Sequence, residues 1–246
     1  MYNLKFRLCE KNIQASVIYK STVDFCRDYE CDFELADIFV SISPFDIAEE
    51  QKRFDREREL EGLSPIVADK RELEQLALYR KITEIIIDQG IILFHGSAIA
   101  VDGKAYLFTA KSGTGKSTHT RLWREHFGER AVMVNDDKPL IKIGDDGVFI
   151  YGTPWNGKHK LGNNIKLPLS AICILERAKE NSIQRVNALS EFPKILSQTY
   201  RNKNADFMKK TLSLLDKMLS EVKVYKLGCN MDPEAAIVSY NGMKGD

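Results

Sequence analysis

Polar and apolar residues alternate at the start of the chain, from Tyr2 to Leu8. A period of two is the spacing of a strand with one buried face and one wet face. Part of segment 13–19 repeats this alternation, and segment 37–43 has the composition of a third strand. The pattern predicts an antiparallel sheet near the N-terminus.

Two further segments precede residue 90. Pro44 to Gly62 is dense in charges of both signs with few apolar anchors, which fits either a solvated helix or a mobile connector. Asp69 to Glu72 has the spacing of a capping box and predicts the start of a helix that ends at Gly90. Its apolar positions recur at helical spacing: Leu73, Leu76, Ala77, Ile82, Ile85 and Ile86.

Strands and helices mix after residue 90. Asp102-Gly103 separates the apolar runs 91–101 and 104–108, which predicts a tight hairpin and therefore a mixed sheet instead of plain parallel βαβ order. A helix over 117–127, a strand over 131–137 and a second hairpin over 140–151 are expected to follow. In the last third of the sequence the pattern predicts elements of the core. They are a strand over 165–176, helices over 190–200 and 205–222, and a short helix after Asp232-Pro233.

Composition narrows the class of protein. The 246 residues carry a net charge of +1, which argues against a dedicated nucleic-acid surface or a polybasic membrane anchor. No run approaches the roughly 20 apolar residues that span a bilayer, and the alternating N-terminus is unlike a signal segment, so a cytoplasmic location is expected. The five cysteines lack C-x-x-C spacing, so neither a disulfide framework nor a zinc site is indicated.

Segment 110–118, called the phosphate loop below, reads Ala-Lys-Ser-Gly-Thr-Gly-Lys-Ser-Thr and stands between a predicted strand and a predicted helix. Gly113 and Gly115 permit the positive φ angles at which successive N–H groups converge on one anion. Lys116 would reach the β- and γ-phosphates of a nucleotide, and Ser117 would ligate Mg²⁺. The usual pattern begins with Gly where this chain has Ala110. A solvated Gly/Ser/Lys turn is the alternative.

Two carboxylates, Asp136 and Asp137, end the predicted strand that follows the phosphate-loop helix. Adjacent carboxylates near Mg²⁺ can divide two tasks, since one can serve the metal while the other orients a nucleophile. A turn or an N-cap is the alternative for this pair. His95, which lies in an apolar strand, is either a site residue or a hydrogen-bonded core histidine.

These motifs, in this order, resemble the HPr kinase and phosphoenolpyruvate carboxykinase superfamily. The resemblance rests on Phe94-His-Gly-Ser-Ala98, the Asp-Gly hairpin, the phosphate loop and Asn135-Asp-Asp137, and it covers roughly residues 91 to 176. The small size is similar to that of the HPr-kinase catalytic domain and of lasso-peptide kinases. The fold class implied is α/β, with a mixed-sheet P-loop nucleotide-binding core and a small α+β N-terminal segment.

The resemblance also implies roles for individual residues. Asp136 would be the base that takes the acceptor's proton, Asp137 would serve the metal together with Ser117, and His95 would lie beside the transferred phosphate. Seven residues would hold the triphosphate of ATP: Ser112, Gly113, Thr114, Gly115, Lys116, Ser117 and Thr118.

Segment 151–164 is rich in Gly, Asn and basic residues, a composition suited to a loop that closes over a site. Lys158 and Lys160 are the candidates for neutralising charge in the transition state, because the segment contains no arginine. An exposed polar turn with Trp155 as a packing anchor is the alternative.

The sequence therefore predicts an ATP- and Mg²⁺-dependent kinase of a hydroxyl acceptor, with residues 1–68 as a segment for acceptor recognition and 69–246 as the catalytic domain. A serine of a peptide or protein is favoured, because strand edges near the N-terminus could pair with an extended chain. A small-molecule alcohol kinase and a non-catalytic ATP-binding regulatory module are the alternatives, whereas carboxykinase activity ranks low. Neither nucleic acid nor membrane is an expected partner, and a homo-oligomer is left open.

Overall fold

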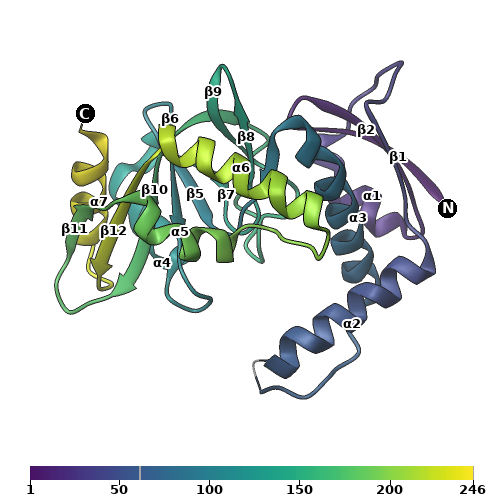
Figure 1. The fold of residues 1–246 in the computed structure, drawn as a ribbon, viewed down its shortest axis with the longest axis horizontal. Helices are drawn as coiled ribbons and strands as arrows, with labels where there is room; N and C mark the ends of the chain where they lie inside the picture. Colours follow the sequence, from purple (N-terminus) through teal and green to yellow (C-terminus); the bar gives the residue numbers. More distant parts are fainter. Residues whose placement is uncertain (61, 246) are drawn as a thin grey trace. The chain divides into compact units, whose positions relative to one another are not determined.

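A computed structural model describes residues 1–60 and 62–245 (Figure 1). The chain forms two compact units, the first comprising Met1–Ile86 and the second beginning at Ile87. Helix α3 (Lys70–Ile86) therefore belongs to the N-terminal compact unit, whereas the sequence predicted it to be part of the catalytic domain. The functional division of the chain stays a prediction.

A three-stranded sheet forms the centre of the N-terminal unit. Strand β1 (Tyr2–Leu8) pairs antiparallel with β2 (Lys11–Val17), as the alternation predicted. The hairpin turns at Cys9 and Glu10, both at positive φ. Strand β3 (Ile38–Ser41) pairs parallel with β2, so the sheet is mixed and not wholly antiparallel as expected. The crossover between β2 and β3 contains helix α1 (Lys20–Phe25), which the sequence analysis missed.

The charged segment after Pro44 is helix α2 (Pro44–Leu60), which settles the choice between helix and connector. Ile47 and Glu50 anchor this helix, because their side chains are buried. The Glu50 carboxylate accepts hydrogen bonds from the Arg80 guanidinium of α3. This ion pair offsets the cost of burying the Glu50 carboxylate.

Glu74 lies on the buried face of α3 and has no exposed surface. Its carboxylate accepts hydrogen bonds from the backbone N–H groups of Ile18 (2.5 Å) and Tyr19 (3.0 Å), and from the Thr22 hydroxyl (2.5 Å). These donors stand at the start of α1, which has no side-chain cap of its own at Tyr19. Glu74 therefore supplies that helix start with its acceptor from a different element.

We expect Glu74→Ala to lower the free energy of unfolding by about 4 kcal/mol, because one buried and two partly buried donors lose their acceptor. Urea denaturation followed by circular dichroism measures this change. Glu72→Ala is the matched control, since Glu72 is exposed on the same helix, and it should cost less than about 1 kcal/mol. Equal effects of the two variants would contradict the role given to Glu74.

A nine-stranded mixed sheet forms the core of the C-terminal unit. Its main strand order is β4-β8-β9-β10-β6-β5-β7, with β12 on β10 and β11 on β12. The strands are β4 (Ile91–Leu93), β5 (Ser97–Val101), β6 (Lys104–Thr109), β7 (Ala131–Asn135), β8 (Leu140–Gly144), β9 (Gly147–Tyr151), β10 (Lys166–Arg177), β11 (Ser182–Arg185) and β12 (Lys223–Cys229). Both predicted hairpins, β5–β6 and β8–β9, are present.

Helices cover both faces of this sheet. The helices are α4 (Lys116–Phe127), α5 (Ala188–Gln198), α6 (Ala205–Glu221) and α7 (Glu234–Lys244). Strand β10 contributes alternate residues to two apolar clusters: Ile172 and Ile174 pack with residues of α5 and α6, whereas Cys173 and Leu175 pack with residues of α4 and α7. The unit is a mixed α/β protein with a sheet between two helical layers.

The run 91–101 is not one strand, contrary to expectation. It breaks at Phe94–Gly96, between β4 and β5. The N–H of Phe94 donates to Pro139, that of His95 to Gln198 and that of Gly96 to Asp137. Three successive N–H groups thus bond to segments outside the ladder between β5 and β6, which lets β4 and β5 pair with different neighbours. Strands β11 and β12 were also missing from the sequence analysis.

His119 is buried against Trp123 of the same helix, with its Nε2 3.0 Å from Ser239 Oγ. Burial lowers the pKa of His119 from 6.5 to about 4. Between these two values the unfolded chain binds a proton that the folded chain does not, so stability falls as pH falls.

We expect acidification from pH 6.5 to pH 4 to remove about 3 kcal/mol of stability through this histidine alone. Urea denaturation at a series of pH values should show the loss. In His119→Gln the free energy of unfolding should fall less steeply as the pH falls. His126→Gln changes an exposed histidine of the same helix and is expected to keep the wild-type slope. An unchanged slope in His119→Gln would refute the assignment.

Candidate functional site

The phosphate loop connects the end of β6 to the start of α4, which is the strand–turn–helix arrangement that the sequence predicted. Gly113 (φ 75°) and Gly115 (φ 124°) both have positive φ. A side chain at either position would be strained, so glycine is required by the backbone. The N-terminal end of the loop is buried at Ala110, whereas Ser112 and Ser117 are exposed.

Helix α4 begins without a side-chain cap and without an acidic residue in its first turn. Helices α5 and α6, by contrast, are capped by the side chains of Asn187 and Asn204. The first N–H groups of α4 are therefore not satisfied by a cap from the described residues. Such a helix start favours an anion through its free donors and its dipole.

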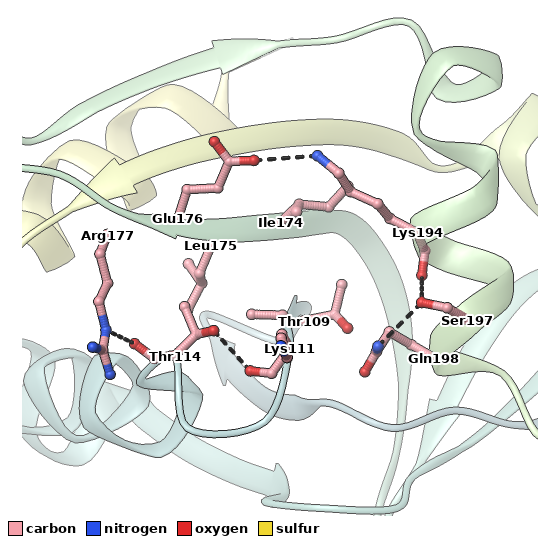
Figure 2. A pocket seen from close by; sticks show the side chains of 11 residues that line it. Thr109, Lys111, Thr114, Ile174, Leu175, Glu176, Arg177, Lys194, Ser197 and Gln198 are labelled. Carbon is pink, nitrogen blue, oxygen red and sulfur yellow. Dashed lines mark hydrogen bonds and ion pairs between the residues drawn. The ribbon is translucent and has the colours of Figure 1, made fainter. Parts of the chain in front are cut away.

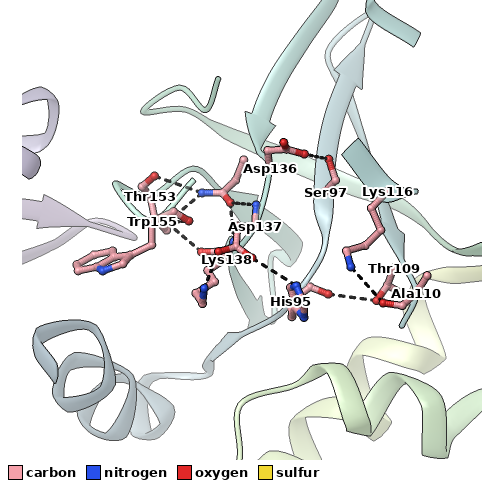
Figure 3. Close-up of polar contacts among 11 residues, drawn as sticks. His95, Ser97, Thr109, Ala110, Lys116, Asp136, Asp137, Lys138, Thr153 and Trp155 are labelled. Atoms are coloured by element: carbon pink, nitrogen blue, oxygen red, sulfur yellow. Dashed lines mark hydrogen bonds and ion pairs between the residues drawn. The ribbon is translucent and has the colours of Figure 1, made fainter. Parts of the chain in front are cut away.

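Lys116 is the first residue of α4. Its Nζ donates to the Ala110 carbonyl at 3.1 Å, so the side chain lies back along the loop (Figure 3). Burial lowers the pKa of Lys116, and the charges of Asp137 and Asp136 oppose this shift. Both carboxylates therefore interact electrostatically with the Lys116 ammonium.

Arg177, at the end of β10, holds the turn of the phosphate loop. Its Nη2 donates to the Gly113 carbonyl at 2.5 Å and its Nε to the Thr114 carbonyl at 3.4 Å. Arg177 was not predictable as a site residue, because its two contacts span more than 60 positions and no local motif marks them.

Asn135 shapes the turn that presents the two carboxylates. Its Oδ1 accepts from the backbone N–H groups of Asp137 (2.9 Å) and Lys138 (2.7 Å). Its Nδ2 donates to the hydroxyl and carbonyl oxygens of Thr153. The segment is thus a turn, as one alternative held, but its backbone N–H groups are satisfied by the Asn135 amide and not by the two carboxylates.

Asp136 is buried with 8% of its surface exposed. Ser97 Oγ donates to Asp136 Oδ1 at 2.5 Å (Figure 3). The same Oγ lies 3.0 Å from Thr120 Oγ1 of helix α4. Through these two hydroxyls the carboxylate is connected to helix α4, whose first residue is Lys116. Its second oxygen, Oδ2, has no hydrogen-bond partner among the described residues.

Asp137 points to different partners. Its Oδ2 pairs with Lys138 Nζ at 2.5 Å, and its Oδ1 lies 3.4 Å from His95 Nε2 (Figure 3). Burial lowers the pKa of His95, as do the charges of Lys116 and Lys138, whereas Asp137 acts in the opposite direction. The lowered pKa favours the neutral form of the imidazole. Ser97 belongs to the Phe94–Ala98 motif of the sequence but had no predicted role, and Lys138 was not among the predicted site residues.

The loop from Gly152 to Ile165 is partly anchored. An added Cβ at Gly152 would lie 1.8 Å from the Asn163 carbonyl oxygen, so only glycine fits where the two ends of the loop meet. Trp155 is buried, as the packing alternative held. Lys158 and Lys160 are exposed, and Lys158 forms no hydrogen bond or ion pair with the described residues. The neighbouring Gly157 lies beside Asp137, with an added Cβ 3.5 Å from its Cβ.

No cluster of three or more His, Cys, Asp or Glu side chains that could hold a metal ion occurs among the described residues. Oxygen donors in or close to the phosphate loop include the Ser117 hydroxyl and the carboxylates of Asp136 and Asp137, whose charges act on Lys116. Mg²⁺ prefers oxygen ligands and commonly takes one or two carboxylates together with substrate phosphates and water. The donor set fits Mg²⁺ that arrives with a nucleotide, with Ser117 and Asp137 as the predicted ligands.

Two pockets flank the phosphate loop. One, of about 520 Å³, is lined by the loop, the end of β10 and helix α5, and is called the α5 pocket (Figure 2). Its lining includes the charged side chains of Lys111, Glu176, Arg177 and Lys194. The other, of about 490 Å³, lies between the loop, the first turn of α4 and the ends of β10 and β12, and is called the β12 pocket.

The geometry defines a mixed α/β protein with a strand–glycine-turn–helix loop facing an acidic turn. No family model and no curated protein matches this chain. A solved structure of the Hpr(Ser) kinase/phosphatase from Coxiella burnetii is similar over 62% of this chain and 99% of that one, with 11% identity and a TM-score of 0.34. No described helix is long and apolar enough to cross a membrane.

Proposed function

We propose that this protein is an ATP- and Mg²⁺-dependent kinase that transfers the γ-phosphate to a hydroxyl group. One observation carries the proposal: a buried carboxylate, Asp136, is tied through Ser97 and Thr120 to the helix that begins at Lys116. The proposed anion site and a carboxylate with one unpaired oxygen are thus connected by hydrogen bonds.

The phosphate loop and the first turn of α4 would hold the triphosphate with their N–H groups, and Lys116 would move from the Ala110 carbonyl to the β- and γ-phosphates. Bound Mg²⁺ would neutralise charge on the phosphate oxygens. Arg177 would preserve the shape of the loop by holding its carbonyls. Positioning and charge neutralisation are the main demands of phosphoryl transfer.

Asp136 is proposed as the base. Ser97 holds its Oδ1 by a hydrogen bond, which leaves Oδ2 to accept the proton of the attacking hydroxyl. Asp137 would ligate Mg²⁺ together with Ser117, after its pairing with Lys138 is exchanged for the metal. Neutral His95 would lie beside the transferred group, and Lys138 and Lys158 are the nearby cations for the developing charge.

The acceptor proposed is a serine of a peptide or protein. Strand β3 is at the edge of the N-terminal sheet and exposes Phe39. An extended chain can add to such an edge through backbone hydrogen bonds, with a side chain such as Phe39 adding specificity. A small-molecule alcohol is the second acceptor class.

The test is transfer of labelled phosphate from [γ-³²P]ATP, with Mg²⁺, to a panel of serine peptides and small alcohols. Isothermal titration calorimetry of ATP in parallel separates binding from transfer. Transfer to a hydroxyl supports the kinase. ATP binding without transfer or hydrolysis under any condition would instead support a regulatory nucleotide-binding module, and no ATP binding would refute both.

A further inference from the structure

The site has two distinguishable ends along the sheet. The acidic turn follows β7, and β5 separates β7 from β6, the strand that leads into the phosphate loop. Strands β10 and β12 lie on the opposite side of β6. A triphosphate with its γ-phosphate at Asp136 would therefore have its α-phosphate toward β10 and β12.

Strands β6, β10 and β12 are mutually parallel, so their carboxyl ends form one edge of the sheet. In open α/β sheets ligands bind in the crevice outside such ends. Both pockets described above lie at this edge.

The two pockets differ in the charged side chains that line them. The α5 pocket contains Lys111, Lys194 and Glu176, whose charged groups would have to lose water against a neutral base. In the β12 pocket, Arg177 is the one fixed charge among the described lining residues, and its guanidinium already bonds the carbonyls of Gly113 and Thr114. The β12 pocket is therefore the less costly place for an uncharged aromatic ring.

The remaining lining of the β12 pocket suits a flat ring. Met231 is 77% exposed and offers a polarisable thioether, and Arg177 offers the plane of its guanidinium. Both groups stack favourably on aromatic rings. Asn230 is occupied within the fold, since its amide donates to Lys179 and Asp232 and accepts from Asn181. It forms a rigid wall of the pocket.

We propose that the nucleoside of the bound triphosphate, a purine base with its ribose, occupies the β12 pocket, between the phosphate loop and the ends of β10 and β12, with the base against Met231. This inference rests on the proposed function, because it takes the phosphate loop as the triphosphate site. It assigns the β12 pocket to recognition of the nucleotide and leaves the α5 pocket to other ligands.

Photolabelling with 8-azido-ATP tests the location directly. Trypsin separates the candidates, because Leu227–Lys244 carries the β12 side and Ile195–Arg201 carries the α5 side. We expect the label in Leu227–Lys244, and tripolyphosphate should suppress it by competing at the phosphate loop. Suppressible label in Ile195–Arg201 instead would overturn the inference.

Affinities provide an independent measurement. Calorimetry should show that Met231→Ala weakens ATP binding about three- to tenfold and changes tripolyphosphate binding less than about twofold. Leu189→Ala is the control, because Leu189 is an exposed apolar residue of a different pocket. It should change neither the affinity for ATP nor the affinity for tripolyphosphate. Equal weakening of both ligands by Met231→Ala, or equal wild-type affinity for both, would overturn the inference. Failure of wild type to bind either ATP or tripolyphosphate would instead refute the proposed function.

Discussion

Replacing Asp136 by Asn is expected to lower the rate of phosphate transfer by about 10³-fold while ATP still binds. The amide keeps an oxygen for the hydrogen bond from Ser97, so the turn and the fold should persist. It cannot accept the proton of the attacking hydroxyl, and this is the step that fails. Single-turnover transfer from labelled ATP measures the rate, and calorimetry measures the ATP affinity.

Asp145→Asn is the matched control, since Asp145 is an exposed carboxylate that pairs with Lys217 away from the site, and its transfer rate should equal that of wild type. A transfer rate within twofold of wild type in Asp136→Asn would remove the base from the proposal. Loss of Mg²⁺-dependent ATP binding in this variant would show that Asp136 is the metal ligand, with the roles of the two carboxylates exchanged.

The second large effect concerns Lys116. We expect Lys116→Ala to weaken ATP binding about a hundredfold, because a partly buried ammonium loses its contacts with two phosphates. The backbone of the phosphate loop is expected to hold, since the hydrogen bonds from Arg177 to Gly113 and Thr114 do not involve Lys116. Titration calorimetry with ATP and with tripolyphosphate should show the same loss for both ligands.

Lys111→Ala tests whether any positive charge in the loop would produce this effect. Lys111 belongs to the same loop, but it is exposed and lines the α5 pocket. We expect its removal to weaken ATP binding less than about threefold, as for an exposed charge screened by salt. Equal losses in the two lysine variants would show that only general charge attraction operates here.

Local chemistry made several features predictable. The Asp102-Gly103 hairpin was confirmed because both turn residues adopt positive φ, a conformation that this dipeptide accepts readily. The glycine positions of the phosphate loop were predictable for the same reason. Helix α3 begins at Lys70, and Asp69 accepts the N–H of Arg71, as expected of a helix start.

Other features depend on residues far apart in the sequence. Strand β12 (Lys223–Cys229) was missed because it directly follows α6 and is recognisable chiefly from its pairing with β10 and β11. The break at Phe94–Gly96 follows from three N–H groups that bond to Pro139, Asp137 and Gln198. No local pattern contains these partners.

The amino-acid sequence alone determined the features whose cause is local. These are the glycine turns, the two hairpins, the helix that follows the phosphate loop and the adjacency of the two carboxylates. Only the tertiary structure decided what those carboxylates touch. It placed Asp136 on Ser97, 39 positions away in the sequence, and it placed Arg177 on a loop more than 60 positions distant. Backbone angles and periodicity depend on neighbouring residues, whereas hydrogen bonds between distant segments exist only after the sheet has set their strands side by side.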